Sequence, residues 1–437
     1  MGPCFHYCQT DGENSHFGIN IYSNARQYSP KIKLVVGPFT HSAPEDNSPG
    51  PGFDGKSDMV SWFDYWLKGH DTGILAEPDL TLFIRNGTSA GEYRYYDHWP
   101  LNKMKSKRFF MMKNKKLEDT TSSWVMSSDK LEYKPWIGFE AGYWWGSSID
   151  LDQSKYDRDC LVYESDVLQY AIEIIGYVNV SLQVSTTSKL AHWMIRLEDV
   201  YNQTAIMVTG GALNGAQRNN RSNPEYFIPN QIYNLTFRLH FTTWTFLPQH
   251  QIRLSISNAY FFTHWPTPEP MTTTIYHNPI TYIDLPVISH CHSSASPIIP
   301  LFTQKSVDPS DEMYLNKLVY KSEPKIYYKT DTDFDTTITY ETNTHQTINH
   351  IQIQSNLSFN FTCSHIDPSN VTWITQAKHF YRFLSTNRTL ELITNMNVYS
   401  DNAYFYTNLN RLLTDNSQIK QQQLNYQFFG KQKRQFQ

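Results

Sequence analysis

The sequence lacks an apolar run long enough to cross a membrane. None of its 437 residues lies in an uninterrupted apolar stretch near the roughly 18 residues that a membrane-spanning helix needs. The first residues, MGPCFH, have neither the charged start nor the apolar centre of a signal peptide. These observations leave the compartment open, so both the cytoplasm and secretion remain possible.

An excess of positive charge is also missing. Lys and Arg number 37 against 41 Asp and Glu, which gives a net charge of −4. Proteins that bind nucleic acid usually carry a basic face, so we expect no nucleic-acid partner. Apolar residues make up 40% of the chain and aromatic residues 15%, which is enough to build a large core.

Cysteine is scarce. The five cysteines are an odd number, and their spacing fits neither a zinc ribbon nor a redox CxxC motif. We interpret them as free or partly buried thiols and expect neither a metal nor a cofactor. They are Cys4, Cys8, Cys160, Cys291 and Cys363.

The opening of the chain has the texture of an α/β domain. Residues 31–36 (KIKLVV) form a short apolar run that predicts a buried strand, ending at the turn Gly37-Pro38. Residues 57–68 (SDMVSWFDYWLK) carry apolar side chains at helical spacing, with Gly69 as the stop. A further short helix is expected at residues 19–27.

After Pro78 the pattern changes to short β-type runs separated by Gly, Pro, Asn and Thr clusters. Many such strands without intervening helices predict a β-sandwich or jelly roll. We therefore expect two domains, residues 1–76 and 77–437, with a long loop or insert at 286–335. The strand candidates include residues 80–84, 171–175, 179–184, 233–239, 252–256 and 350–359.

Several motifs follow one another in a recognisable order. They are LVVGPFTH at 34–41, WFDYWLKG at 62–69, RDCLVY at 158–163, RLEDV at 196–200 and HQIRLSIS at 250–257. The set resembles the C-terminal part of the CocE/NonD family of serine hydrolases, which includes cocaine esterase and X-Pro dipeptidyl-peptidase. Each piece alone is weak, but convergence would not reproduce the order.

The resemblance implies a mainly β fold, in which a jelly-roll sandwich follows the last portion of an α/β-hydrolase domain. It also implies hydrolysis through a Ser-Asp-His triad, with His41 as the base. An imidazole can accept and return a proton near neutrality. The family's orienting carboxylate would fall near Asp11, although the family's Gly-Trp-Tyr lead is absent there; Glu13 is the alternative.

The nucleophile is the missing member. In α/β-hydrolases the chain order is Ser, acid, His, so the resemblance implies a serine on polypeptide before Met1. Residues 87–91 (GTSAG) match G-x-S-x-G literally, but they follow His41, and no helical pattern comes after them. We interpret them as a hairpin turn that continues the strand at 80–84.

The predicted function is hydrolysis of ester, amide or Xaa-Pro peptide bonds in a small-molecule or peptide substrate. Without the serine, the chain alone should be inactive by this mechanism, since losing the nucleophile costs on the order of 10⁶ in turnover. Two alternatives stay open. The chain could be a non-catalytic jelly-roll module that binds carbohydrate or a protein, or a separate chain could supply the N-terminal half.

Overall fold

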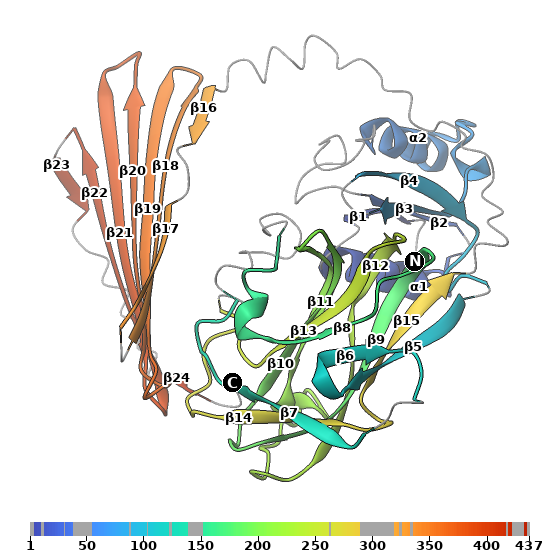
Figure 1. Ribbon diagram of the computed structural model, residues 1–437. Helices are drawn as coiled ribbons and strands as arrows, with labels where there is room; N and C mark the ends of the chain where they lie inside the picture. Colours follow the sequence, from blue (N-terminus) through green and yellow to red (C-terminus); the bar gives the residue numbers. More distant parts are fainter. Residues whose placement is uncertain are drawn as a thin grey trace. The chain divides into compact units, whose positions relative to one another are not determined.

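The computed structural model (Figure 1) describes most of the chain in two compact units. The first unit comprises residues 1–133, 137–263 and 271–305, and the second comprises 134–136, 264–270 and 306–437. The described residues are 4–9, 13–29, 31–37, 55–86, 89–102, 104–121, 125–138, 152–261, 264–288, 319–322, 326–332, 335–416, 418–421 and 432–434.

The first unit begins with a small sheet of four strands, here sheet A, in the order β1-β2-β3-β4. Strands β1 (Cys4–Gln9), β2 (Ile32–Gly37) and β3 (Leu80–Asn86) are parallel, and β4 (Ser89–Tyr96) is antiparallel to β3. Helix α1 (Glu13–Ala25) joins β1 to β2, and α2 (Gly55–Lys68) lies between β2 and β3 in the chain. The expected α/β texture is therefore present.

Strand β2 forms where the apolar run predicted it. All six of its residues are buried, as expected for a parallel strand that is covered on both faces. From α1, Ile19 and Tyr22 pack into the same cluster as Leu34 and Val36 of β2. Both predicted helices exist, although each begins earlier than expected, α1 at Glu13 and α2 at Gly55.

Strand β3 lies in a different sheet from the one expected. We expected residues 80–84 to open the sandwich, but Leu80 and Leu82 pair in parallel with Leu34 and Val36 of β2. The physical reason is that LTLFI is buried on both faces, which suits a covered parallel strand better than a strand with one face to solvent. The domain boundary at 76/77 itself stays a prediction.

The GTSAG segment forms a hairpin, as the sequence indicated. Asn86 of β3 lies opposite Ser89 of β4 in an antiparallel pair. Gly91 is required there because a Cβ atom at that position would lie 2.0 Å from the backbone oxygen of Ile84. The second glycine of the apparent nucleophile motif thus serves the close approach of two strands.

Eleven strands form the sandwich, here sheet B, in the order β11-β10-β13-β8-β6-β5-β15-β9-β14-β7, with β12 also paired to β9. Short 3-10 helices lie at η1 (Ile74–Ala76), η2 (Lys113–Lys115), η4 (Asp157–Asp159) and η5 (Gly215–Gln217). The strands are β5 (Met104–Met112), β6 (Lys116–Glu118), β7 (Ser127–Glu132), β8 (Leu161–Glu164), β9 (Ile172–Thr186), β10 (His192–Tyr201), β11 (Thr204–Asn214), β12 (Tyr233–Phe246), β13 (Gln251–Ser257), β14 (Thr272–His277) and β15 (Tyr282–Ile288).

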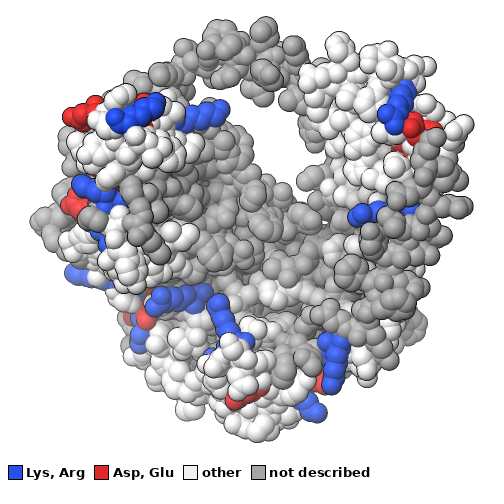
Figure 2. Space-filling model, turned by 180° about the vertical axis from the view of Figure 1, so that it is seen from behind, with Lys and Arg blue, Asp and Glu red and all other residues white. Residues whose placement is uncertain are grey.

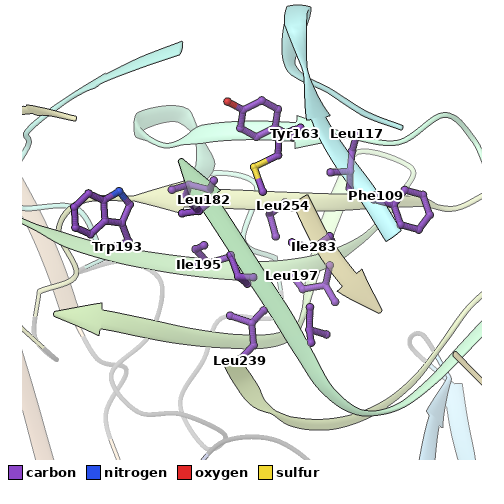
Figure 3. Packing of buried hydrophobic residues seen from close by; sticks show 14 of the residues in the cluster. Phe109, Leu117, Tyr163, Leu182, Trp193, Ile195, Leu197, Leu239, Leu254 and Ile283 are labelled. Atoms are coloured by element: carbon purple, nitrogen blue, oxygen red, sulfur yellow. The ribbon is translucent and has the colours of Figure 1, made fainter. Parts of the chain in front are cut away.

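One apolar core fills the sandwich. Alternate residues of β10, Trp193, Ile195 and Leu197, point into it and meet Leu182 of β9 and Leu254 of β13 (Figure 3). The alternation follows from the two-residue period of a strand. The runs predicted at 171–175 and 179–184 are a single long strand, β9, that passes through Gly176 at a φ of 132°.

Sheet A is fastened to the sandwich by side-chain hydrogen bonds. The Arg85 guanidinium donates to the Val208 carbonyl at 2.6 Å and to Thr242 Oγ1 at 2.7 Å. The Thr243 hydroxyl donates to the Phe83 carbonyl at 2.6 Å. These contacts join β3 to β11 and β12 of the sandwich.

The second unit contains a sheet of nine strands, here sheet C, in the order β16-β18-β19-β20-β21-β22-β23, with β17 paired to β18 and β24 to β22. Its strands are β16 (Val319–Ser322), β17 (Ile326–Asp331), β18 (Asp335–Ile348), β19 (Ile351–Ser364), β20 (Val371–Phe383), β21 (Arg388–Ser400), β22 (Tyr404–Asp415), β23 (Gln418–Gln421) and β24 (Gln432–Lys433). Parts of the stretch predicted as a loop at 286–335 therefore belong to strands.

Strands β18 to β22 form an antiparallel meander, and the backbone angles at its first turn are those of a two-residue hairpin. Asn349 and His350, between β18 and β19, both have positive φ angles, 45° and 67°. Such angles match the twist of a two-residue hairpin, and Asn favours them.

Among the described residues, no helix combines the length and the apolar character needed to cross a membrane. On the face seen in Figure 2, basic and acidic side chains are interspersed instead of being gathered by sign.

Substitution of Gly91 by Ala should destabilise the protein by about 1–3 kcal/mol, the usual cost of overpacking, because the new methyl group would collide with the Ile84 carbonyl. Urea unfolding of the full chain measures the change. The control is Glu92→Ala at the next position, whose side chain is 58% exposed; it should cost less than about 1 kcal/mol. Equal stability of Gly91→Ala and the parent protein would contradict the close approach.

Candidate functional site

The two predicted catalytic residues follow two adjacent parallel strands of sheet A in the chain. Strand β1 ends at Gln9 and β2 at Gly37, and these two residues are register partners. Asp11 follows Gln9 by two positions, and His41 follows Gly37 by four. Both predicted catalytic residues lie outside the described residues, but each comes directly after one of two adjacent parallel strands.

The edge of sheet A at which these strands end suits a catalytic site for general reasons. Neighbouring strands lie about 4.8 Å apart, so the chain leaves the sheet toward both positions from almost the same place. In open α/β sheets, ligands bind beyond the carboxyl ends of the strands. The alternative acid, Glu13, is the first residue of α1.

A buried lysine fixes β2 from the side. Lys33 is 5% exposed, donates to the Ile74 carbonyl at 3.1 Å and forms an ion pair with Glu77. Burial lowers the pKa of Lys33, and the Glu77 carboxylate opposes this effect. The pair ties the strand before His41 to the segment that leads into β3.

Helix α1 is tied to the same segment. The Arg26 guanidinium, just after the helix, donates to Asp79 at 3.0 Å and also bonds the Tyr22 hydroxyl. The Leu34 N–H donates to the Asp79 carbonyl at 2.9 Å. Residues 74–79 therefore hold both the helix after β1 and the strand before His41.

A second group of polar residues has the composition of a catalytic triad, and the sequence did not reveal it. Ser127 Oγ lies 2.8 Å from His277 Nδ1, and His277 Nε2 lies 3.2 Å from Asp129 Oδ2. The Tyr163 hydroxyl donates to the same Asp129 oxygen at 3.0 Å. The residues meet because Ser127 lies opposite His277 in the β7–β14 ladder, a pairing between positions 150 residues apart.

This group serves the core of the sandwich. His277 is 2% exposed and Tyr163 is fully buried. Tyr163 belongs to the same apolar core as Ile275 of β14. Burial lowers the pKa of His277, against the effect of Asp129, and so favours the neutral ring. A neutral ring that donates from Nε2 to Asp129 can accept a hydrogen bond from the Ser127 hydroxyl at Nδ1, so both nitrogens of the buried ring are satisfied.

Another Asp–His pair is also held in place by packing. His250 Nδ1 lies 2.8 Å from Asp199 Oδ1, and the Trp244 indole donates to Asp199 Oδ2 at 2.9 Å. The ring of Tyr201 stacks on His250 with centroids 4.5 Å apart. Both carboxylate oxygens of Asp199 are therefore used within the sandwich.

Metal-binding chemistry finds no support in the part of the chain that the structure describes. No group of three or more His, Cys, Asp or Glu side chains there could hold a metal ion. Cys160 is a partly buried free thiol, and Cys363 is buried.

Comparison with known proteins assigns the chain to a family. The pattern of the family described as X-Pro dipeptidyl-peptidase C-terminal non-catalytic domain matches residues 72–295, just over half of the chain. The chain belongs to this family. The matched segment covers the sandwich and stops before sheet C begins.

Curated relatives include a candidate serine esterase of Mycobacterium bovis and the cocaine esterase of a Rhodococcus species. The first is 25% identical over 312 residues, which cover 64% of this chain and 49% of the relative. The second is 25% identical over 279 residues, which cover 57% of this chain and 46% of the relative. The chain thus spans about half the length of the curated relatives it matches.

Solved structures share the fold. An aminopeptidase from a marine-sediment Thaumarchaeota archaeon superposes with a TM-score of 0.57 at 18% identity, covering 66% of this chain and 55% of that one. A CocE/NonD family hydrolase from Staphylococcus aureus gives 0.52 at 13% identity, covering 65% and 54%. With the cocaine-esterase relative, these findings confirm the resemblance and the mainly β fold predicted from the sequence.

Replacing His277 with Gln should remove part of the acid sensitivity of the fold. The pKa of His277 is lowered on folding. Below about pH 6.5 the His277 ring therefore binds a proton more readily in the unfolded chain than in the folded chain. Stability from this source is present above that pH and is lost as the pH falls. Urea unfolding at pH 7.5, 6.5 and 5.5 should show a smaller decline for His277→Gln than for the parent protein.

His98→Gln, at the protein surface, serves as the control and should retain the decline of the parent protein. If His277→Gln and the parent protein lost stability in parallel, the ring would not be buried in its neutral form.

Proposed function

We propose that this chain supplies the general base and its orienting carboxylate to a serine hydrolase of the CocE/NonD type. The observation that carries the proposal is the parallel pairing of Gln9 with Gly37, because Asp11 and His41 follow these neighbouring strand ends by two and four positions in the chain. The motif LVVGPFTH and the similarity to proteins named serine esterase and cocaine esterase support the same roles.

The proposed chemistry is acyl transfer. His41 takes the proton of a serine hydroxyl while the oxygen attacks the acyl carbon, and it then returns the proton to the leaving group. Asp11 holds the ring in the tautomer and the orientation that this transfer needs, with Glu13 as the alternative acid. The sequence before His41 contains no G-x-S-x-G motif, so the proposed serine lies on polypeptide outside these 437 residues.

The proposed substrates are small esters, amides or Xaa-Pro peptides. The names of the similar proteins include an esterase for cocaine and an aminopeptidase, and both activities attack an acyl carbon. The proposed serine could lie on the same gene product or on a separate chain that complements this one.

A second candidate function is a non-catalytic module that binds carbohydrate or a protein. The description of the matched family as a non-catalytic domain favours it, and His41 lies outside the matched residues 72–295. The two candidates differ in one respect that can be measured, namely whether His41 is needed for turnover.

Hydrolysis of 4-nitrophenyl acetate by the full product of the gene should depend on both residues. We expect His41→Ala to lower the turnover number on the order of 10⁶-fold and Asp11→Asn about 10⁴-fold, as for the corresponding members of a known triad. His70→Ala, at an exposed position after α2, is the matched control and should leave turnover unchanged. Undiminished turnover by His41→Ala would support the binding module instead.

Labelling with a fluorophosphonate should locate the nucleophile. Peptide mapping should find the label on a serine outside these 437 residues, either in the same product or in a chain that purifies with it. The 437-residue chain alone should remain unlabelled. A label on Ser89 or Ser127 would show that the nucleophile lies within this chain and would refute the proposed division of the triad.

A further inference from the structure

A cluster of charged side chains is buried on the outer face of the sandwich. Arg196 and Glu198 point outward from β10, yet their side chains are only 2% and 0% exposed. Across the ladder, Arg253 of β13 lies opposite Glu198, and Glu164 of β8 lies opposite Arg253. Side chains that point away from a core are normally exposed to solvent, so another segment of the chain must cover Arg196 and Glu198.

The cover is the segment at residues 152–160, which carries η4. Its Asp157 side chain is 6% exposed and reaches the cluster. Its backbone is tied to β11, since the Gln153 N–H donates to the Ala205 carbonyl at 2.7 Å and the Ala205 N–H donates to Asp152 at 3.1 Å. Tyr156 packs with buried residues of the sandwich.

The hydrogen bonds in the cluster leave one carboxylate oxygen, Glu198 Oε2, without a donor. Arg196 donates to Glu198 Oε1 at 2.9 Å and to Asp157 Oδ1 at 2.6 Å. Arg253 donates to Asp157 Oδ2 at 2.8 Å and to Glu164 Oε1 at 2.7 Å. Both oxygens of Asp157 are therefore occupied, whereas Glu198 Oε2 is buried without a donor to accept from.

The two buried carboxyl groups, Asp157 and Glu198, are not equally compensated. Arg196 is shared between them, and Arg253 bonds Asp157 and the partly exposed Glu164 but not Glu198, so an ionised Glu198 would keep part of its negative charge uncompensated in a dry site. A buried charge without compensation is strongly unfavourable, and a carboxyl group avoids it by keeping its proton. Asp157, which already accepts from two guanidinium groups, is the carboxyl best stabilised as an anion.

We propose that Glu198 stays protonated in the folded protein at neutral pH and donates its proton to Asp157, so that a neutral acid completes the cluster and holds residues 152–160 on the sandwich. The geometry assigns the proton to Glu198 because Oε2 is buried without a donor to accept from, and because the Arg196 guanidinium that bonds Glu198 Oε1 also bonds Asp157, so the two carboxyl groups are neighbours.

The surroundings of Glu198 agree with this assignment. Burial raises its pKa to about 8, although Arg196 on the same strand opposes the effect. Burial acts in the same direction on Asp157, but Arg196, the Glu198 hydrogen bond and Arg253 outweigh it, so that the pKa of Asp157 is lowered. The remaining neighbours that can titrate, Cys160 and Tyr260, both have raised pKa values because of burial and stay neutral.

The proposal predicts that stability declines as the pH rises from about 4.5 to about 8. The folded pKa of Glu198 lies above the ordinary value, so between about pH 4.5 and pH 8 the folded protein keeps a proton that the unfolded chain has released. The stability that the protonated Glu198 contributes is fully present below about pH 4.5 and is lost as the pH rises to about 8. Because Asp157 lies in the 152–160 segment, that segment should be the first part to loosen.

Glu198→Gln tests the proposal, since the amide keeps the hydrogen bonds of a neutral acid and cannot ionise. For the full chain, the unfolding equilibrium constant of the parent protein divided by that of Glu198→Gln should rise with pH, by up to about tenfold per pH unit between pH 5 and 8. Glu164→Gln is the matched control, since the side chain of Glu164 is 35% exposed. It should keep the pH dependence of the parent protein. A constant ratio for Glu198→Gln would overturn the proposal.

Local release can be measured with trypsin, because Lys155 and Arg158 are exposed residues of the covering segment. Cleavage after them should accelerate with rising pH in the parent protein relative to Glu198→Gln. If that variant fails to fold, infrared spectra of the parent protein still decide the matter. A band of a protonated Glu side chain, identified by isotope labelling of Glu, should be present at pH 7 and lost above pH 9. Its absence at pH 7 would refute the assignment.

Discussion

The parallel pairing of β1 with β2 is the constraint on which the candidate site depends. Parallel strands end at the same edge of a sheet, so Gln9 and Gly37 lie side by side. Had the strands been antiparallel, the six residues of β1 would have separated these ends by roughly 20 Å. No hydrogen bond between Asp11 and His41 could bridge such a gap. The apolar interior of β2 and the buried Lys33–Glu77 pair maintain the arrangement.

The sandwich is connected to the strands of the candidate site through β3, which pairs with β2. Arg85 and Thr243 join β3 to strands β11 and β12 of sheet B. These strands belong to the part of the chain that matches the family, residues 72–295. The charged cluster around Glu198 belongs to the same sandwich and fastens residues 152–160 to it. Sheet C lies beyond the matched residues 72–295, and its structure adds nothing to the assignment of catalytic roles.

The sequence predicted those features that depend on neighbouring residues. The strand at 31–36, the helix at 57–68 and the GTSAG hairpin all appear where local patterns placed them. It did not predict the sheet to which β3 belongs, because an apolar run does not specify its partner strand. The break expected between 175 and 179 was also wrong, because Gly176 continues β9 at a φ that only glycine adopts easily.

The candidate site was predictable only in part. Motif order pointed to His41 and Asp11, which stay predictions, and strand register shows that the ends of β1 and β2 lie side by side. Nothing local revealed the Ser127–His277 or Arg196–Asp157 contacts. Those contacts arise from pairing across 150 and 39 positions of the chain. Glu198 was noted only as part of the motif RLEDV, and its burial could not be predicted because it is due to the 152–160 segment packing over the outer face of β10.

A crystal structure of the full product of the gene would measure the central quantity directly, the distance between the nearer Asp11 carboxylate oxygen and His41 Nδ1. The account predicts a hydrogen bond of about 2.6–3.2 Å, with the other ring nitrogen facing a serine. A His41 ring that lies at the edge of sheet A where β1 and β2 end but beyond the reach of both Asp11 and Glu13, or that is buried in the sandwich, would contradict it.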